Sequence, residues 1–353
     1  MVDDNSPSRA AVERSLAVHT TLRLGGPAAA ITNATNEDEI LHALRTGPPA
    51  LVLAGGSNVV VGDAGVPGPV LLVRTRGVTV SGRGEDADVT VAAGEPWDDV
   101  VARTVADGYR GLECLSGIPG SAGATPVQNV GAYGQEVAET VTAVRAYDRL
   151  ADAVVTLAPA DCRFGYRRSV FKRSSRWTVL AVTFRLTRSP LSAPIRYAEL
   201  AAALGVAQGA GAPLADVRAA VLRLRAGKGM VLDPADPDTY SVGSFFMNPV
   251  VAGDAYAAVL RRAADLGEPR SWPAADGTVK LSAAWLIERA GFGKGFTTGG
   301  GVAVSGKHTL ALTHRGGGST EALLRLARHI RDGVHARFGV TLHPEPVLVN
   351  CAL

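Results

Sequence analysis

One stretch of the chain restricts its fold more than any other. Residues 114–135 are rich in glycine and other small residues and show neither helical nor strand periodicity. A compact domain rarely carries so long a loop without a function. The backbone N–H groups of such a loop could surround a pyrophosphate or the edge of a flavin, although an ordinary Ω-loop also fits the composition.

Strand patterns outnumber helix patterns before residue 190. Apolar, β-branched runs predict strands at 51–53, 59–61, 70–73, 78–80, 89–92, 141–147 and 179–186. Helices are expected at about 37–44, with Asn36 as the N-cap, and from Pro96 as the first helical residue to about Gly108. Strict alternation of strand and helix is absent, which favours an α+β fold over a doubly wound parallel sheet.

The second half of the chain changes character after a linker-like stretch at 205–213, which is rich in glycine and alanine. A helix is expected at 216–226, and the run Asp233–Pro237 then breaks the chain, so we expect the main domain boundary near 227–240. The later elements predicted by periodicity are helices at 255–266, 283–290 and 320–338 and a final strand at 340–349.

Composition excludes several classes of protein. Apolar residues make up 46% and charged residues 20%, which is ordinary for a globular protein, and a formal charge of +3 makes no case for nucleic-acid binding. The chain has no apolar run of about 18 residues and its first residues form no signal peptide, so we expect no membrane insertion and a cytoplasmic location. The three cysteines (Cys114, Cys162 and Cys351) are expected to be free thiols, and covalent flavin attachment at Cys114 is disfavoured.

Familiar nucleotide and metal motifs are missing. No G-x-G-x-x-G follows a predicted strand, which argues against a Rossmann domain. Gly301–His308 resembles a P-loop, but it is one residue short, ends in His308 instead of Ser or Thr, and continues as a strand-like TLALT. The histidines show no zinc spacing, so no metal site is expected.

Two weak motifs could bind anions. Gly55-Gly56-Ser57-Asn58 lies between two predicted strands, so it could be a backbone nest for a phosphate or simply a hairpin turn. In Phe164–Lys172, Arg167 lies among aromatic and basic residues, so it could clamp a carboxylate or belong to a solvated face.

Two other motifs could supply acids. Ser244 lies between Gly243 and two phenylalanines, outside any G-x-S-x-G elbow, which suits a proton donor better than a nucleophile. Glu345 lies between two prolines, where a stiff backbone could orient a catalytic carboxyl group. Either residue could equally be an ordinary turn residue.

The order of these motifs is more specific than any one of them. The segments GGSN, SGIPGSAGATPVQNVGAYGQE, FGYRRSVFK, GSFFMNP, SAAWLIERAGFGKG and LHPEP together strongly resemble the UDP-N-acetylenolpyruvoylglucosamine reductases, over about residues 16–350. The resemblance implies a two-subdomain FAD-binding fold of the vanillyl-alcohol (PCMH) type plus a C-terminal α+β substrate domain. It implies FAD subdomains at 1–75 and 76–228, a substrate-binding domain at 229–338, and a C-terminal strand at 339–353 that returns to the flavin side.

The resemblance also implies a reaction. NADPH would reduce a non-covalent FAD, and flavin N5 would pass a hydride to C3 of an enolpyruvyl UDP-sugar, giving UDP-N-acetylmuramate for peptidoglycan synthesis. Arg167 and Glu345 would bind and polarise the carboxylate, with Glu345 protonated so that it does not repel the developing charge. Ser244 would give a proton to C2, and Lys228 could assist it.

Further contacts are carried over by resemblance. The implied substrate contacts are Tyr166, Tyr197, Asn248 and His308. The implied flavin contacts are Gly55, Ser57, Asn58, Gly117, Gly120, Ser121, Gly123, Ala124, Gln128 and Gly131. The UDP-sugar would be the only partner of a monomer. A vanillyl-alcohol-type oxidase that uses oxygen and a non-catalytic flavin or UDP-sugar carrier are the alternatives.

Overall fold

The computed structural model describes residues 14–82 and 84–353, which form two compact units. The N-terminal unit comprises 28–56 and 67–231, and the C-terminal unit comprises 14–27, 57–66 and 232–353. The chain passes between the units for the last time at Val231–Leu232. The segments 14–27 and 57–66 group with the C-terminal residues, a division that differs from the predicted subdomain at 1–75.

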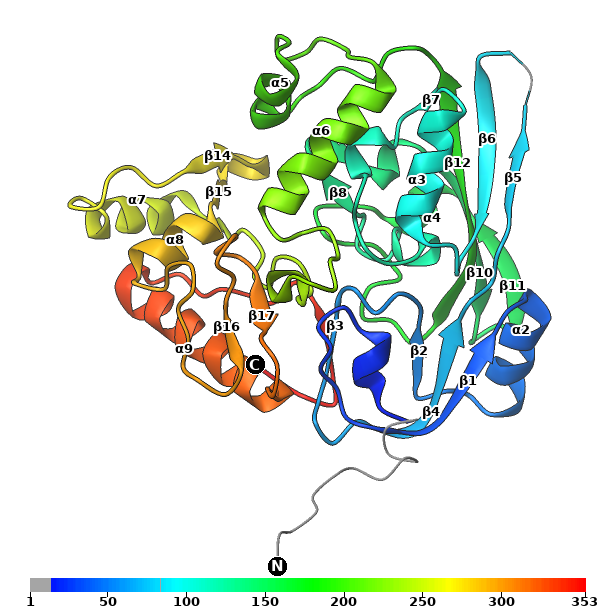
Figure 1. Ribbon diagram of the computed structural model, residues 1–353, viewed down its shortest axis with the longest axis horizontal. Coiled ribbons are helices and arrows are strands. Elements are labelled where there is room, and N and C mark those ends of the chain that lie inside the picture. The colour runs from blue at the N-terminus through cyan, green and yellow to red at the C-terminus, as the bar shows by residue number, and fades with distance from the viewer. Residues whose placement is uncertain (1–13, 83) are drawn as a thin grey trace, which may run out of the picture. The chain divides into compact units, whose positions relative to one another are not determined.

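The main sheet of the N-terminal unit is antiparallel, with strand order β11-β10-β12-β6-β5 and with β7 also paired to β12 (Figure 1). Its strands are β5 (Val78–Ser81), β6 (Asp86–Ala92), β7 (Tyr109–Arg110), β10 (Val141–Asp148), β11 (Ala153–Leu157) and β12 (Trp177–Arg188). Alternate residues of β12, from Leu180 to Leu186, are buried, because a strand turns successive side chains to opposite faces. The buried face packs on α3 (Trp97–Ala106) through Trp97 and Phe184, whose ring centroids are 5.6 Å apart.

A smaller sheet of this unit has the order β1-β4-β2, formed by Ala28–Ala34, Val66–Val73 and Leu51–Leu53. Helix α2 (Glu37–Thr46) follows β1, and the Asn36 side chain accepts a hydrogen bond from the Glu39 N–H, so the predicted N-cap is confirmed. Strand β1 has no predicted counterpart. Its residues alternate poorly between apolar and polar, so the sequence carries little periodic signal there.

Helices α5 (Ala198–Leu204) and α6 (Leu214–Gly227) of the N-terminal unit pack against each other. Helix α6 also packs against α3 and the 3-10 turn η2 (Glu113–Leu115). Pro96 is the N-cap of α3 and not its first helical residue. Shorter pieces of the unit are the 3-10 turns η3 (Ala122–Ala124) and η4 (Val137–Glu139), the strands β8 (Gly131–Ala132) and β9 (Gln135–Glu136), and helix α4 (Pro159–Cys162).

The C-terminal unit is built around α9 (Thr320–Phe338), which packs against α7 (Gly253–Arg262), α8 (Ala283–Arg289) and the β16–β17 pair, Val302–Val304 with Leu312–His314 (Figure 1). A three-stranded sheet has the order β13-β15-β14, formed by Val250–Val251, Val279–Leu281 and Ser271–Pro273. The unit also contains the 3-10 turns η1 (Leu16–His19), η5 (Pro237–Thr239) and η6 (Ala275–Gly277).

The predicted final strand at 340–349 is too long. Strand β18 covers only Val347–Val349 and pairs in parallel with β3 (Val59–Val61). Pro344 and Pro346 lack the N–H group that a continuous ladder needs, so the strand can begin only after them. The predicted helix at 255–266 is also displaced, because α7 begins at Gly253 and ends at Arg262.

Among residues 14–82 and 84–353, none of the helices combines the length and the apolar character needed to span a bilayer. Within the same residues, His, Cys, Asp and Glu side chains form no cluster that could hold a metal ion.

Candidate active site

The long loop at 114–135 lies in the N-terminal unit and is held by the start of α3. Gly120 accepts a backbone hydrogen bond from Trp97, at 3.0 Å, and the N–H of Gly123 donates to Ala93 at 2.9 Å. Asp98 accepts the N–H of Gly117 at 2.5 Å and forms two hydrogen bonds with Arg218, at 2.6 and 2.8 Å. The glycine-rich segment therefore has a defined shape, although its regular structure is limited to short 3-10 turns and two-residue strands.

Gly55 lies directly against this loop. A side chain at Gly55 would place its Cβ 2.5 Å from Cα of Gly120 and 3.2 Å from the nitrogen of Ser121, so only glycine fits at that position. Strand β2 pairs with β4, whereas β3 pairs with β18, and these ladders belong to different sheets. The predicted alternative, a hairpin turn at 55–58, is therefore wrong.

Several donors in these two glycine segments are available to a ligand. Within residues 14–82 and 84–353, the backbone N–H groups of Gly55, Gly56, Gly120 and Ser121 make no hydrogen bond. Donors of this kind, in a part of the chain without bulky side chains, suit the phosphates of a dinucleotide. The donor set therefore fits FAD, and Gly55, Gly120 and Ser121 are the predicted flavin residues that the fold brings together.

Arg167 occupies a tight turn of the N-terminal unit. Gly165 and Arg168 pair through two backbone hydrogen bonds, which leaves Tyr166 and Arg167 at the tip of the turn. Arg167 has φ 53°, a left-handed conformation that is uncommon for a residue with a side chain. Its Nη2 donates to the Gly131 carbonyl at 2.9 Å, which connects the predicted carboxylate clamp to the glycine loop.

Asn129 is a buried residue of the loop whose role was not predicted. Its Nδ2 donates to Glu136, at 2.7 Å, and to the Gly165 carbonyl, while its Oδ1 accepts the N–H of Ala138. These bonds hold the loop and the Arg167 turn together. Burial inside a polar loop leaves no periodic signal in a sequence, so only its place beside Gln128 could have suggested it.

The aromatic residues Tyr133 and Tyr197 meet edge to face, with ring centroids 5.4 Å apart. Lys228 lies over the Tyr133 ring at 5.7 Å and donates to Glu199 at 2.6 Å. Tyr197 and Tyr166 each expose about two fifths of their surface, at 42% and 43%, so both predicted substrate contacts are accessible.

In the C-terminal unit the segments of Ser244 and Glu345 run side by side. Phe245 accepts the backbone N–H of Glu345 at 2.9 Å, and Phe246 pairs with Pro344. On the other edge, Ser244 pairs with Ala311 and the Phe245 N–H donates to Leu310 at 2.7 Å. Phe245 and Phe246 are fully buried, so they anchor the segment that carries Ser244 and leave the serine itself half-buried.

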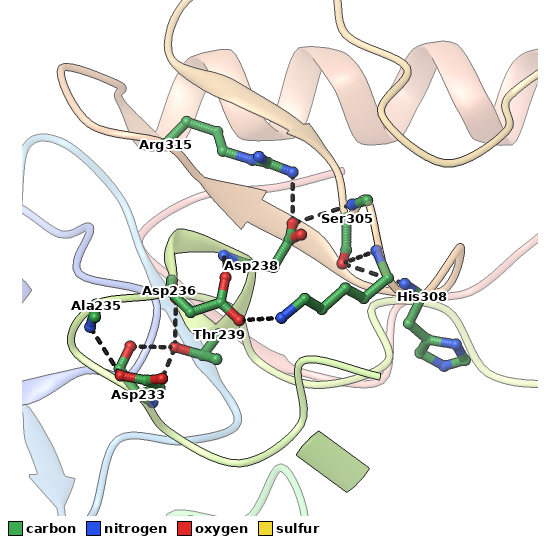
Figure 2. A network of polar contacts seen from close by, with 10 residues as sticks. Asp233, Ala235, Asp236, Asp238, Thr239, Ser305, His308 and Arg315 are labelled. Atoms are coloured by element: carbon green, nitrogen blue, oxygen red, sulfur yellow. Dashed lines mark hydrogen bonds and ion pairs between the residues drawn. The ribbon is translucent and has the colours of Figure 1, made fainter. Parts of the chain in front are cut away.

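A polar network next to these segments holds the turn at 305–308 (Figure 2). Asp238 accepts the N–H of Gly306 at 3.0 Å and a guanidinium hydrogen bond from Arg315 at 2.5 Å. Asp236 accepts from Lys307 at 2.6 Å, and this bond lowers the pKa of the Asp236 carboxyl. The network therefore fixes a turn that begins at Ser305, whose N–H donates to Ala311, the partner of Ser244.

The predicted substrate contacts His308 and Asn248 also lie in the C-terminal unit. The backbone N–H of His308 donates to the Ser305 hydroxyl at 3.2 Å, and Figure 2 shows its imidazole pointing away from the Asp236 and Asp238 carboxylates. Asn248 Oδ1 accepts the N–H of Ala283 at the start of α8, so its side chain has a structural partner as well.

All three cysteines are free thiols, and Cys114 and Cys162 are buried. Burial raises the pKa of Cys114 to about 12, so its thiol keeps its proton near neutral pH. Such a thiol is a poor nucleophile, which agrees with the expectation of a non-covalent flavin.

Comparison with known proteins agrees with this geometry. Residues 28–156 match an FAD binding domain, and residues 234–349 match the C-terminal domain of UDP-N-acetylenolpyruvoylglucosamine reductase. A protein of that name from Salinispora arenicola is 64% identical over 348 residues, which cover 97% of this chain and 96% of the relative. The relative from Thermobifida fusca is 54% identical, covering 96% and 97%, and the one from Mycobacterium tuberculosis is 50% identical, covering 96% and 95%.

One solved structure has the same fold across almost the whole chain. It is the crystal structure of UDP-N-acetylenolpyruvylglucosamine reductase from Thermus caldophilus, with a TM-score of 0.64, 24% identity, and coverage of 95% of this chain and 97% of the other. The predicted α+β fold is confirmed.

An FAD-binding domain joined to a reductase domain defines a flavin-dependent reductase. The chain belongs to the family of UDP-N-acetylenolpyruvoylglucosamine reductases, enzymes of peptidoglycan precursor synthesis.

Proposed function

We propose that the chain uses NADPH and FAD to reduce UDP-N-acetyl-3-O-(1-carboxyvinyl)-glucosamine to UDP-N-acetylmuramate in the cytoplasm. The observation that carries the proposal is the pairing of two acid-bearing segments, since the N–H of Glu345 donates to Phe245, the residue after Ser244. The identity of 50% to 64% with relatives of this name over nearly the whole chain supports the same substrate.

Non-covalent FAD, reduced by NADPH, would supply the hydride from its N5 to C3 of the enolpyruvyl group. The chain's part in holding FAD falls to the glycine segments, with the N–H groups of Gly55, Gly120 and Ser121 as donors. The remaining flavin contacts that we propose are Ser57, Asn58, Gly117, Gly123, Ala124, Gln128 and Gly131.

The three catalytic residues have complementary roles in this proposal. When the hydride reaches C3, negative charge develops at C2 and spreads into the carboxylate. Arg167 binds that carboxylate, and protonated Glu345 donates a hydrogen bond to it, so both stabilise the growing charge. Ser244 then protonates C2, which completes the addition of a hydride and a proton across the double bond.

The remaining roles concern recognition. Tyr166, Tyr197, Asn248 and His308 contact the UDP-sugar, and the accessibility of the two tyrosines supports this. The enzyme acts as a monomer. Lys228, which binds Glu199 in the structure, is the cation that could stabilise the Ser244 alkoxide.

The test separates the two half-reactions of the Ser244→Ala variant. Anaerobic reduction of FAD by NADPH should proceed at the wild-type rate, because no substrate proton is moved in that step. Reoxidation by the enolpyruvyl substrate should slow by about 10²–10⁴-fold, the usual contribution of a positioned acid. Stopped-flow absorbance of the flavin follows both steps.

Ser81→Ala, which removes an exposed hydroxyl of β5, is the matched control and should leave both rates unchanged. Normal reoxidation of Ser244→Ala would refute the proton-donor role. If, without any sugar substrate, the rate of oxygen consumption matched the rate of NADPH oxidation, the oxidase alternative would be favoured.

A further inference from the structure

Arg225, near the C-terminal end of α6, is a partly buried cation to which neither the family matches nor the proposed reaction gives a role. It lies outside both matched segments, which end at 156 and begin at 234. Its Nη2 donates to the Met230 carbonyl at 2.8 Å. Its Nε is completely buried and has no hydrogen-bond partner anywhere in residues 14–82 and 84–353.

The guanidinium faces the glycine loop. A side chain at Gly117 would place its Cβ 3.4 Å from Nε of Arg225, so the guanidinium lies next to the backbone of this glycine. Gly117 has φ 70°, a conformation that favours glycine independently. Tyr133, from the same loop, is the other polar neighbour, and its phenol and the guanidinium influence each other's ionisation.

Charge around Arg225 is not balanced. The Asp98 carboxylate attracts the Arg225 cation, but Asp98 already accepts two hydrogen bonds from Arg218 and one from Gly117. The Asp99 carboxylate attracts the Arg218 cation. Burial lowers the pKa of Arg225 to about 10, with Tyr133 and Asp98 opposing the shift, so the group remains a cation at neutral pH.

A desolvated cation without a full set of partners is costly to a fold, and an anionic ligand removes that cost. Arginine presents its donors in a planar fork that suits phosphate oxygens. The loop beside it also carries the unpaired N–H groups of Gly120 and Ser121, three and four residues after Gly117. The loop that carries these two N–H donors is therefore the loop that Arg225 contacts at Gly117.

We infer that Arg225 is a binding residue for a phosphate oxyanion of the nucleotide ligand held by the glycine loop. FAD and the UDP-sugar both carry a diphosphate, and FAD is favoured because Gly117 lies in the segment that matches an FAD binding domain. The inference rests on the proposed function, because it presumes that the loop holds a nucleotide. The competing role is structural: Arg225 is a basic residue in the last turn of α6, and its bond to Met230 holds the segment that follows the helix.

The two roles differ in what happens to the ligand-free chain. If Arg225 only stabilises the end of α6, Arg225→Met should weaken the apoprotein. If Arg225 binds an anionic ligand instead, the same substitution removes an unbalanced buried charge from the ligand-free chain. The apoprotein should then unfold at the same urea concentration as wild type or at a higher one. Only the second role predicts weaker ligand binding together with unchanged or improved apoprotein stability.

The experiment uses the full-length chain freed of FAD. Flavin fluorescence gives the Kd for FAD, calorimetry on the FAD-loaded chain gives the Kd for UDP, and urea unfolding gives the apoprotein midpoint. For Arg225→Met we expect the FAD Kd to rise by roughly tenfold or more, as the loss of a hydrogen bond to a charged group predicts. Arg225→Lys should be intermediate, since lysine keeps the charge but not the fork, and Arg223→Met removes an exposed arginine of the same helix and should match wild type.

The outcomes separate clearly. A selective loss of UDP affinity, with FAD binding intact, would support the anion site and assign it to the substrate diphosphate. Unchanged affinity for both ligands, or a lower apoprotein midpoint in Arg225→Met, would overturn the inference while leaving the proposed function intact. A wild-type chain that bound no FAD would overturn both.

Discussion

Gly55 and Gly120 lie against each other, and their close contact requires the absence of a side chain on Gly55. Each belongs to a segment without regular structure, and the two segments touch at a distance that excludes a side chain on Gly55. The contact brings two sets of unpaired N–H groups into the same region of the N-terminal unit. The requirement for glycine is therefore steric, and its consequence for function is the placement of donors.

Replacing Gly55 by alanine tests this contact. The new Cβ would lie 2.5 Å from Cα of Gly120, so the two loops must separate. We expect a loss of stability of about 1–3 kcal/mol, as for overpacking elsewhere, and weaker FAD binding. Urea unfolding and fluorescence titration measure the two effects.

Gly47→Ala is the control, because a Cβ at Gly47 meets no atom within 4 Å. If Gly55→Ala bound FAD as tightly as Gly47→Ala, the donors of the two loops would not depend on their close approach.

At the level of elements, the Ser244 segment depends on its neighbours for position. It is bonded to residues 310–311 on one edge and to 343–345 on the other. The turn at 305–308, which leads into the first of these partners, is fixed by Asp236 and Asp238 from η5 and the residue before it (Figure 2). A change in η5 can therefore reach Ser244 through the turn without touching the substrate.

Asp238→Asn tests this coupling. An amide in place of the carboxylate weakens the bonds to Arg315 and Gly306, which are charge-assisted in the native chain. We expect reoxidation of the flavin by substrate to slow by roughly tenfold, since the loss of a charged hydrogen bond costs about 1.5–3 kcal/mol. Reduction by NADPH should not change.

Asp265→Asn, at an exposed side chain of the same unit, is the matched control. Equal slowing of both half-reactions in Asp238→Asn would point to a general loss of folded protein instead of a displaced serine.

The whole molecule consists of two units that the chain does not build in sequence order. The core of the C-terminal unit includes Leu22, Leu24 and Val60, and β18 has β3 as its partner. Asp63 accepts the N–H groups of Thr320 and Glu321, so it caps the first turn of α9 from a segment more than 250 residues earlier in the chain. The C-terminal unit is therefore not made of C-terminal residues alone, because it also contains 14–27 and 57–66.

This organisation predicts how the chain can be divided. A fragment of residues 232–353 lacks three core side chains, the partner of β18 and the Asp63 carboxylate at the start of α9, so it should not unfold cooperatively in urea. A fragment of 28–231, with 57–66 replaced by a flexible linker of equal length, keeps its hydrophobic clusters and should unfold cooperatively. Circular dichroism measures both, and a sharp transition in the first fragment would contradict the assignment of 14–27 and 57–66.

Local chemistry made several features of this protein predictable from the sequence. Asn36 caps its helix as expected, because a cap is an interaction between residues close in the chain. The periodic helix that ends at Phe338 is found at its predicted bounds, because one apolar face is buried along its length. The order of the motifs was enough to indicate the family.

Tertiary structure decided what depends on residues distant in sequence. The Gly55–Gly120 contact, the hydrogen bonds of Asn129 and the unpaired Nε of Arg225 leave no local pattern, because each depends on which segments fold against each other. The same reason explains the wrong hairpin at 55–58, since the partners of β2 and β3 lie in other parts of the chain. The sequence by itself determined the Asn36 cap, the long helix at 320–338 and the family, whereas long-range packing determined which of the glycines, acids and cations came to share an environment.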